Sequence, residues 1–324
     1  MKFTEEELKQ YSLPLSDSEN QKCLNAIKMV RDALSEIGFS DSGEPIGKMY
    51  EDTYAYSLEM RSISHNRKVK IFLQGSYANN TNVRTESDVD IAIVQEDIFR
   101  TKYRDSYSQY PQCDEDYKFT KAAPRNKSFK DEVQECLLRK FGNDVIRKNK
   151  SIKIIGNTYR KDADAVPCLR YRDYRNDYRK DADNYVPGIV ITSDKGETII
   201  NYPEQHIKNG KEKNVATSYY YKKMVRIIKK IRYIMIEQNI CAEDGVSSFG
   251  LESLLWNIPD DIFKKYTTYR YEFDEIVKYL YENINNLSNY KEANGIKDLF
   301  SLERRINDYQ DFIKKLYNFY SYDI

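Results

Sequence analysis

The sequence has little of the material on which several classes of protein depend. His65 and His206 are its only histidines, and its five cysteines are widely spaced, with no CxxC pair. These counts disfavour histidine-based catalysis, a zinc site and a disulfide framework. No apolar run approaches the roughly 18 residues of a membrane-spanning helix, and the polar N-terminus MKFTEEELKQ does not resemble a signal peptide. We therefore expect a protein of the reducing cytoplasm without a membrane anchor.

An excess of charge of one sign is also missing, because 52 basic residues stand against 51 acidic ones. This balance does not indicate a general attraction to nucleic acid or lipid, and it gives no indication of a nucleic-acid activator. The composition, 40% hydrophobic and 32% charged, is that of a globular protein, and 324 residues are enough for two domains. With so few histidines and cysteines, any chemistry must rest on carboxylates.

The first part of the chain mixes helical and strand patterns. Apolar residues near the N-terminus recur at helical spacing, whereas residues 87–95 alternate between apolar and polar positions, as in a half-buried strand. In chain order we expect helices at 18–37 and 48–64, a strand ending at Gly75, a strand at 87–95, a helix at 128–141, strands at 151–155 and 163–169, and a hairpin over 188–203 that turns at Asp194-Lys195-Gly196.

From residue 217 onward the patterns are almost wholly helical. We expect two lobes, residues 1–210 and 211–324, with the N-terminal helix extending across both. The connecting stretch 204–216 contains no Gly/Ser/Pro tract, so it does not read as a flexible linker. The expected helices of the second part are at about 218–238, 249–256, 271–284 and 301–320.

The central feature is Gly75-Ser76, followed after eleven residues by Asp88-Val89-Asp90. A Gly-Ser turn at the end of a strand lets backbone N–H groups and a hydroxyl approach phosphate oxygens closely. Asp88 and Asp90 are two apart on a strand, so they project from the same face and can bridge two magnesium ions about 3.5–4 Å apart. Either feature alone would be an ordinary turn or strand, but together they predict a phosphate and metal site.

A third carboxylate is needed near the attacking hydroxyl of such a site. Asp164, which opens an apolar strand, is the preferred candidate because the strand would place it on a rigid scaffold. Asp162 shares its face by strand alternation and is the first fallback. The sequence YRKDAD occurs at residues 159–164 and again at 178–183, so Asp183 is the second fallback.

At this point the sequence resembles a known family. QGSYANNT and SDVDIAIV together resemble the signature of the DNA polymerase β-like nucleotidyltransferase superfamily, and ADAVPC resembles its third-carboxylate strand. Within that superfamily the chain is similar to the bacterial cGAS/DncV-like nucleotidyltransferases (CD-NTases) of anti-phage signalling, from about residue 20 to about residue 260. The stretches NYPEQHIKNGKEKNVATSYYYKKMVRIIKKIR and SSFGLESLLWNIP support this resemblance.

The resemblance implies a fold and a set of site residues. The fold would be α+β and bilobed, a polymerase β-like core of mixed sheet and helices followed by a helical second lobe. Asp88, Asp90 and Asp164 would bind two Mg²⁺ ions, for which Mn²⁺ could substitute, with Asp164 nearest the attacking ribose hydroxyl. The nucleotide-binding residues would be Gly75 and Ser76 at the triphosphate, Lys229 and Ser248 at the donor phosphates, and Phe249 stacked on the donor base.

The residues themselves support part of this assignment. Lys222, Arg226 and Lys229 fall at i, i+4 and i+7, which gives one cationic helix face suited either to triphosphate or to solvent. Phe249 is open to two interpretations, as a core aromatic or as a base-stacking residue. The Tyr/Arg-rich segment 170–185 favours a solvated loop over the edge of the active site, because its basic and acidic residues nearly cancel.

The resemblance also implies an activity. The enzyme would join NTPs, ATP among them, into a cyclic di- or oligonucleotide that switches on a separate effector protein in anti-phage defence. Two alternatives remain open. One is a template-free nucleotidyltransferase that acts on RNA ends or on a protein, and the other is a nucleotide-binding module without catalysis. The balanced charge disfavours the RNA enzyme, and the presence of all three aspartates disfavours the inactive module.

Overall fold

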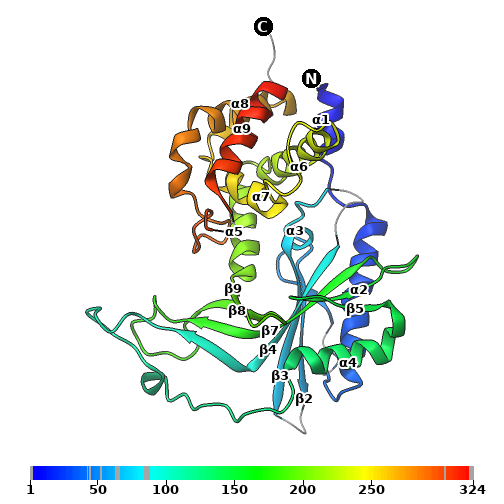
Figure 1. Ribbon diagram of the computed structural model, residues 1–324, viewed down its shortest axis with the longest axis vertical. Helices are drawn as coiled ribbons and strands as arrows, with labels where there is room; N and C mark the ends of the chain where they lie inside the picture. Colours follow the sequence, from blue (N-terminus) through cyan, green and yellow to red (C-terminus); the bar gives the residue numbers. More distant parts are fainter. Residues whose placement is uncertain are drawn as a thin grey trace. The chain divides into compact units, whose positions relative to one another are not determined.

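The chain folds into two compact units, which are built from interleaved segments. The computed structural model describes residues 3–41, 43, 45–51, 53–62, 66–83, 88–302 and 304–320. The sheet unit contains residues 17–74 and 88–205, and the helical unit contains residues 1–16, 75–87 and 206–324. Figure 1 shows both units along the chain.

Among the described residues, nine strands form one mixed sheet in the sheet unit. The central order is β1-β2-β3-β4-β7-β6-β5, and β8 and β9 extend from β7 as a hairpin. The one parallel pair is β4 with β7, and this pair lies at the centre of the sheet (Figure 1). The strands are β1 Gly47–Lys48, β2 Tyr56–Ser62, β3 Arg67–Gln74, β4 Val89–Lys102, β5 Val145–Arg147, β6 Ile152–Ile154, β7 Ala163–Asp173, β8 Val186–Thr192 and β9 Thr198–Asn201.

Two helices pack against the sheet and against each other. These are α2 (Asp17–Ser35), which contacts β3 and β4, and α4 (Phe129–Phe141), which contacts β7. The Ser128 side chain caps α4 by accepting a hydrogen bond from the backbone N–H of Asp131 (3.1 Å). Val89, Ile91 and Ile93 alternate along β4, so they lie on one face of the sheet, where they are fully buried.

The opposite face of the central strands carries polar groups at both ends of an apolar patch. Ala92, Val94, Val166 and Cys168 form this patch together with residues of β3 and β8. At one end of it, buried Arg170 forms ion pairs with Glu96 and with Glu204 (2.6 Å), and Glu204 also pairs with Lys70 (2.6 Å). At the other end stand the aspartates of β4 and β7. Helix α5 (Pro203–Ala216) starts next to the Arg170 network and continues from the sheet unit into the helical unit.

The helical unit has one hydrophobic core, to which its longer helices contribute. Ile228, Leu254, Phe273 and Leu316 are among its buried residues, one from each of four helices. Its remaining helices are α1 Glu5–Tyr11, α3 Gly75–Ala78, α6 Tyr221–Glu237, α7 Ser248–Trp256, α8 Tyr269–Glu282 and α9 Ile306–Tyr320. None of the described helices is both long enough and apolar enough to cross a membrane.

Several expected elements are confirmed, including the helix at 128–141 and the hairpin over 188–203, but two expectations differ from the structure. The expected helix at 48–64 is wrong, because its described part contains the end of β1, an irregular stretch and β2, in which buried and more exposed side chains alternate (residues 52, 63 and 64 lie outside the described residues). The stretch 204–216, which did not read as a flexible linker, lies within helix α5. The N-terminal helix does not extend across both lobes, because α1 and α2 are separate helices that belong to different units.

The boundary between units also differs from the expected division after residue 210. It falls between Gln205 and His206, and residues 1–16 and 75–87 join the helical unit although they precede the boundary in sequence. The physical reason is visible in the loop after α3. Its backbone carbonyls accept hydrogen bonds from buried cations of α6, as described below, so this loop packs with helices rather than with the sheet.

Candidate active site

A row of polar side chains crosses the centre of the sheet at one end of the parallel pair. Three register pairs make up this row. Gln74 of β3 pairs with Asp90 of β4, Asp90 pairs with Asp164 of β7, and Asp164 pairs with Lys153 of β6. Side chains of residues that are paired in this way project from the same face of a sheet. The expected proximity of Asp90 and Asp164 is therefore a direct consequence of strand register.

A second row lies one step toward the start of the same two strands. Asp88 and Asp162 each lie two residues before the members of the first row, and the backbone N–H of Val89 donates to the carbonyl of Asp162 (2.9 Å). Lys153 joins these two carboxylates, because its Nζ lies 3.0 Å from Asp88 Oδ2 and 2.7 Å from Asp162 Oδ2. The β4–β7 strand ends therefore hold four carboxylates in two rows.

The negative charge of these rows is incompletely compensated. Burial, followed by the charges of Asp164 and Asp88, raises the pKa of Asp90 to about 7. Lys148 offsets part of this effect; its Nζ lies 3.3 Å from Asp164 Oδ1, but its side chain is 42% exposed. A raised carboxylate pKa of this origin marks a position where an added cation would be favoured.

The donor set fits the chemistry of Mg²⁺, which prefers hard carboxylate oxygens. Asp164 Oδ1 is buried, and the cation beside it is the Lys148 ammonium, at 3.3 Å and without hydrogen-bond geometry. Among the residues that the structure describes, however, no three acidic, cysteine or histidine side chains are gathered closely enough to hold a metal ion. Strand register pairs Asp90 with Asp164, whereas Asp88 is engaged by Lys153, so the three-carboxylate metal site stays a prediction.

The structure also separates the three candidates for the third carboxylate. Asp164 occupies the row of Asp90, as preferred from sequence. Asp162 is bound on both oxygens, by Lys153 and by the backbone N–H of Gly156, and the hydrogen bond from Lys153 is the largest cause of its lowered pKa. Asp183 is exposed in the loop that follows β7, at the other end of that strand from Asp164. The geometry therefore favours Asp164 over both fallbacks.

The Gly75-Ser76 turn follows β3 directly and starts α3. Gly75 has a φ of +69°, in the left-handed region that glycine tolerates best, which explains the residue type at the turn. Both residues are partly exposed, whereas Tyr77 and Ala78 behind them are buried. The backbone N–H of Thr81 donates to the carbonyl of Ser76 (2.9 Å), so the loop after α3 closes back on the turn.

The cationic face expected on α6 points into the helical unit. Lys222, Arg226 and Lys229 are all buried, at 3%, 4% and 2% exposure. Arg226 donates to the backbone carbonyls of Ser12 and Asn80, and Lys229 donates to the carbonyl of Thr81 (3.0 Å). Arg226 and Lys229 therefore bind backbone within the helical unit, and the phosphate contacts of this face stay a prediction.

Sequence reasoning missed the acidic partner of this group, Glu252 of α7. Its carboxylate pairs with Lys229 (3.0 Å) and accepts from the Thr81 hydroxyl (2.6 Å) and from His206 (2.8 Å). Burial alone would raise the pKa of Glu252, but Lys229 and His206 lower it well below its usual value. The expected structural role of His206 is consistent with these contacts. A buried acid in the otherwise apolar SFGLESLLW stretch was the one sequence signal for this cluster.

Ser248 and Phe249 open helix α7 and are both partly exposed. The capping role belongs to the preceding residue, Ser247, whose hydroxyl accepts from the N–H of Gly250 (3.0 Å). The Phe249 ring packs edge-on against His206, and the Arg304 guanidinium lies 5.4 Å from the ring centroid. Part of the Phe249 ring is therefore occupied within the helical unit, and the rest is exposed.

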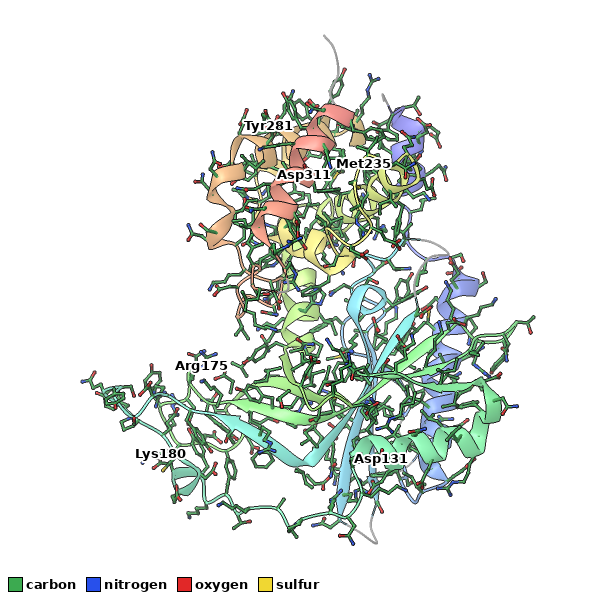
Figure 2. The ribbon with its side chains drawn as sticks, viewed as in Figure 1. Asp131, Arg175, Lys180, Met235, Tyr281 and Asp311 are labelled. Carbon is green, nitrogen blue, oxygen red and sulfur yellow. The ribbon has the colours of Figure 1, made fainter. Side chains whose placement is uncertain are left out.

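The Tyr/Arg-rich segment 170–185 does not lie over the active-site edge. Its residues occupy the end of β7 that is opposite to Asp164 and the loop that follows, and along an extended strand Arg170 lies about 20 Å and Asp173 about 30 Å from Asp164. Figure 2 labels Arg175 and Lys180 in this loop. Arg175 pairs with Asp173 and Lys180 pairs with Asp116, both at 2.6 Å, so its charges are matched locally.

A mixed sheet with paired carboxylates on adjacent strands, a Gly-Ser turn and a helical second part define a polymerase β-like nucleotidyltransferase. Comparison with known families agrees. A nucleotidyltransferase domain model matches residues 57–155, and the model of the cGAS/DncV-like nucleotidyltransferase C-terminal helical domain matches residues 208–321.

Individual relatives match over nearly the whole chain. A cyclic GMP-AMP synthase, CdnE03, of Staphylococcus schleiferi is 47% identical over 99% of this chain and 98% of its own. The solved CdnE cyclic dinucleotide synthase of Elizabethkingia meningoseptica with GTP and Apcpp is 32% identical, with a TM-score of 0.71 over 99% of this chain and all of that one. The CdnE c-UMP-AMP synthase of Rhodothermus marinus with Apcpp and Upnpp is 27% identical, with a TM-score of 0.77 over 99% of both chains.

The chain belongs to the family of cGAS/DncV-like nucleotidyltransferases. The expected family and the expected α+β, two-part nucleotidyltransferase fold are thereby confirmed.

Proposed function

We propose that this enzyme joins nucleoside triphosphates into a cyclic dinucleotide or short cyclic oligonucleotide. The observation that carries the proposal is the pairing of Asp90 with Asp164 on the parallel strands β4 and β7. Strand β3, which leads into the Gly75-Ser76 turn, pairs with β4 on its other side. The relatives support the proposal, since proteins that match nearly the full length of this chain are named as cyclic nucleotide synthases.

The carboxylates would act on the two nucleotides in different ways. When bound by Asp88, Asp90 and Asp164, Mg²⁺ supplies Lewis-acid activation of a hydroxyl and neutralises phosphate charge, and two ions are the arrangement expected for an in-line displacement. Asp164 would orient the attacking ribose hydroxyl and favour loss of its proton, a role supported by its register pairing with Asp90. The hydroxyl would attack the α-phosphate of the donor nucleotide, and pyrophosphate would leave. A second transfer of the same kind, with loss of a second pyrophosphate, would close the ring.

The remaining contacts to the donor nucleotide are assigned to exposed groups. Gly75 and Ser76 would bind the triphosphate through the turn, where both residues are accessible. Ser248 would add a phosphate contact, and the exposed part of Phe249 would face the donor base. Because Lys229 and Arg226 bind the carbonyls of the loop after α3, we assign them the support of this loop in place of direct phosphate contact.

The substrates and the biological role follow from the family. We expect ATP to be one substrate, and a separate effector protein to be switched on by the cyclic product in anti-phage defence. The relatives differ in the bases of their products, which include purine and pyrimidine pairs. The base composition is therefore a property of this chain to be measured.

The test is incubation of the purified protein with all four labelled NTPs and Mg²⁺, followed by phosphatase treatment and mass spectrometry. A parallel incubation contains phage lysate, and the control is the double variant Asp88→Ala/Asp90→Ala. A phosphatase-resistant cyclic product, absent from the control, is the expected result and identifies the bases. Label transferred to RNA or to a protein, with no cyclic product in either incubation, would replace this proposal with a template-free transferase.

A further inference from the structure

Lys153 occupies an unusual position for a cation on the edge of a proposed metal site. It lies on β6 as the register partner of Asp164, yet its ammonium group reaches across to the second row of carboxylates. There it bridges Asp88 (3.0 Å) and Asp162 (2.7 Å), and its side chain is only 22% exposed. Lys153 is thus a resident counter-ion between the ends of β4 and β7.

The surroundings hold Lys153 in this position. Asp162 accepts a hydrogen bond from the backbone N–H of Gly156 with one oxygen and binds Lys153 with the other. A Cβ added at Gly156 would lie 2.5 Å from the backbone nitrogen of Asp162, so this close approach requires glycine. The hydrogen bond from Gly156 therefore fixes the position of the Asp162 carboxylate, and this carboxylate in turn binds the Lys153 ammonium.

The contact with Asp88 has a consequence for metal binding. Asp88 is one of the carboxylates expected to bind metal, but it is turned to Lys153, and the described residues contain no assembled group of three ligands. A lysine ammonium and a divalent ion compete for Asp88, because both draw on the negative charge of the same carboxylate and each weakens the attraction of the other. The like charges of Lys153 and the ion also repel each other.

We propose that Lys153 is a positioning residue that holds Asp88 in the metal-free enzyme and is displaced from it when a divalent cation binds. This inference rests on the proposed metal site at Asp88, Asp90 and Asp164. It assigns Asp162 a supporting role as the fixed partner that retains Lys153 nearby after displacement. Lys153 then compensates the charge of Asp88 and Asp162 when no metal is bound, and the affinity for metal is lower than the carboxylates alone would give.

The test measures Mn²⁺ binding to the purified protein without nucleotide, from the electron paramagnetic resonance signal of free Mn²⁺ at low salt. Lys153→Met is expected to bind Mn²⁺ roughly three- to tenfold more tightly than wild type, because a competing cation has been removed. Lys153→Gln is the second variant if the first does not fold. Lys153→Arg keeps the charge and is expected to bind within about twofold of wild type.

Matched variants separate the outcomes. Lys150 lies three residues earlier in the same segment and is exposed, and Lys150→Met is expected to leave Mn²⁺ affinity unchanged. Asp90→Asn should abolish binding, which assigns the measured site. Equal or weaker binding by a folded Lys153→Met or Lys153→Gln protein would overturn the role of Lys153. Absence of Mn²⁺ binding in wild type and every Lys153 variant would instead overturn the metal site, and with it the proposed function.

Discussion

Asp90 shows how one carboxylate acquires its properties from strand register. It faces Asp164 across a parallel pair and lies two residues after Asp88, so it has acidic neighbours on two sides. Burial and these neighbours raise the pKa of its carboxyl group to about 7. A carboxyl group whose pKa is higher in the folded than in the unfolded protein stabilises the fold when it is protonated. Its contribution to the free energy of unfolding therefore decreases as the pH rises.

The first prediction concerns this sign. The folded protein binds the Asp90 proton more tightly than the unfolded chain does, so metal-free wild type should lose stability as pH rises from about 4 to about 7. The loss is at most about 4 kcal/mol, the value for a shift of roughly three pKa units. Urea unfolding in EDTA at several pH values measures it, and Asp90→Asn should remove this component of the slope. Parallel pH profiles for the two proteins would contradict the assigned pKa.

Lys229 shows the limit of residue-scale reasoning from sequence. Its spacing with Lys222 and Arg226 indicated a cationic helix face, and that face exists, but it is buried. The partners that bury it are Glu252 and the carbonyls of residues 80 and 81, which lie far away in sequence. Helical spacing shows which side chains share a face, but it does not show what that face contacts.

The second prediction follows from this burial. Lys229→Met should lower the free energy of unfolding by about 3 kcal/mol, because Glu252 would lose its buried ion-pair partner. The neighbouring Lys230→Met is the control, and its partly exposed position predicts a change below about 1 kcal/mol. Chemical denaturation measures both. Unchanged stability of Lys229→Met, combined with a raised KM for NTP, would show that Lys229 contacts phosphate after all.

At the scale of elements, the sequence was most informative where a pattern was long and local. The starts of β4 and β7, helix α4 and helices α6, α7 and α8 were predicted to within a few residues. Strands β4 and β7 extend beyond their predicted ends at 95 and 169, to Lys102 and Asp173, and α9 starts at Ile306 rather than at 301. The parallel pairing of β4 with β7 was not predicted, because it joins segments about seventy residues apart. Asp164 could be nominated from its place at a strand start, whereas Lys153 could not, since its reach to Asp88 depends on this pairing.

One element was misread and another was missed, each for a physical reason. Residues 56–62, which form β2, lie in a stretch rich in good helix formers, and their strand identity comes from pairing with β3 on one side and β1 on the other. Residues 203–216 lack a clear apolar stripe, yet they form α5. The first turn of α5 is fixed by Glu204, which pairs with Arg170 and Lys70 of the sheet.

The third prediction tests this junction between sheet and helix. Arg170→Met should destabilise the protein by about 3 kcal/mol, because Glu96 and Glu204 would keep their charges in a buried setting without their shared partner. Lys68→Met is the matched control in the same sheet, since its pair with Glu59 joins two half-exposed side chains. Its expected effect is below about 1 kcal/mol. Similar unfolding midpoints in urea for the two variants would contradict the structural role of the Arg170 network.

At the scale of the whole molecule, the chain builds two compact units from interleaved segments. The Gly75-Ser76 turn and the loop after it belong with the helices, whereas the site carboxylates, which follow them in sequence, belong with the sheet. The fold class and the family could be predicted from sequence because the Gly-Ser and Asp-Val-Asp motifs have a specific spacing. The division into units could not, because it depends on the buried contacts of Arg226, Lys229 and Glu252.

The central claim is that the carboxylates of β4 and β7 catalyse nucleotidyl transfer. The measurement that tests it most directly is the rate of pyrophosphate release from NTPs by wild type and by Asp90→Asn, with the exposed loop variant Asp181→Asn as control. We predict that wild type and Asp181→Asn release pyrophosphate at similar rates and that folded Asp90→Asn is slower by at least roughly a hundredfold. A folded Asp90→Asn protein with the wild-type rate would contradict the assignment of this site.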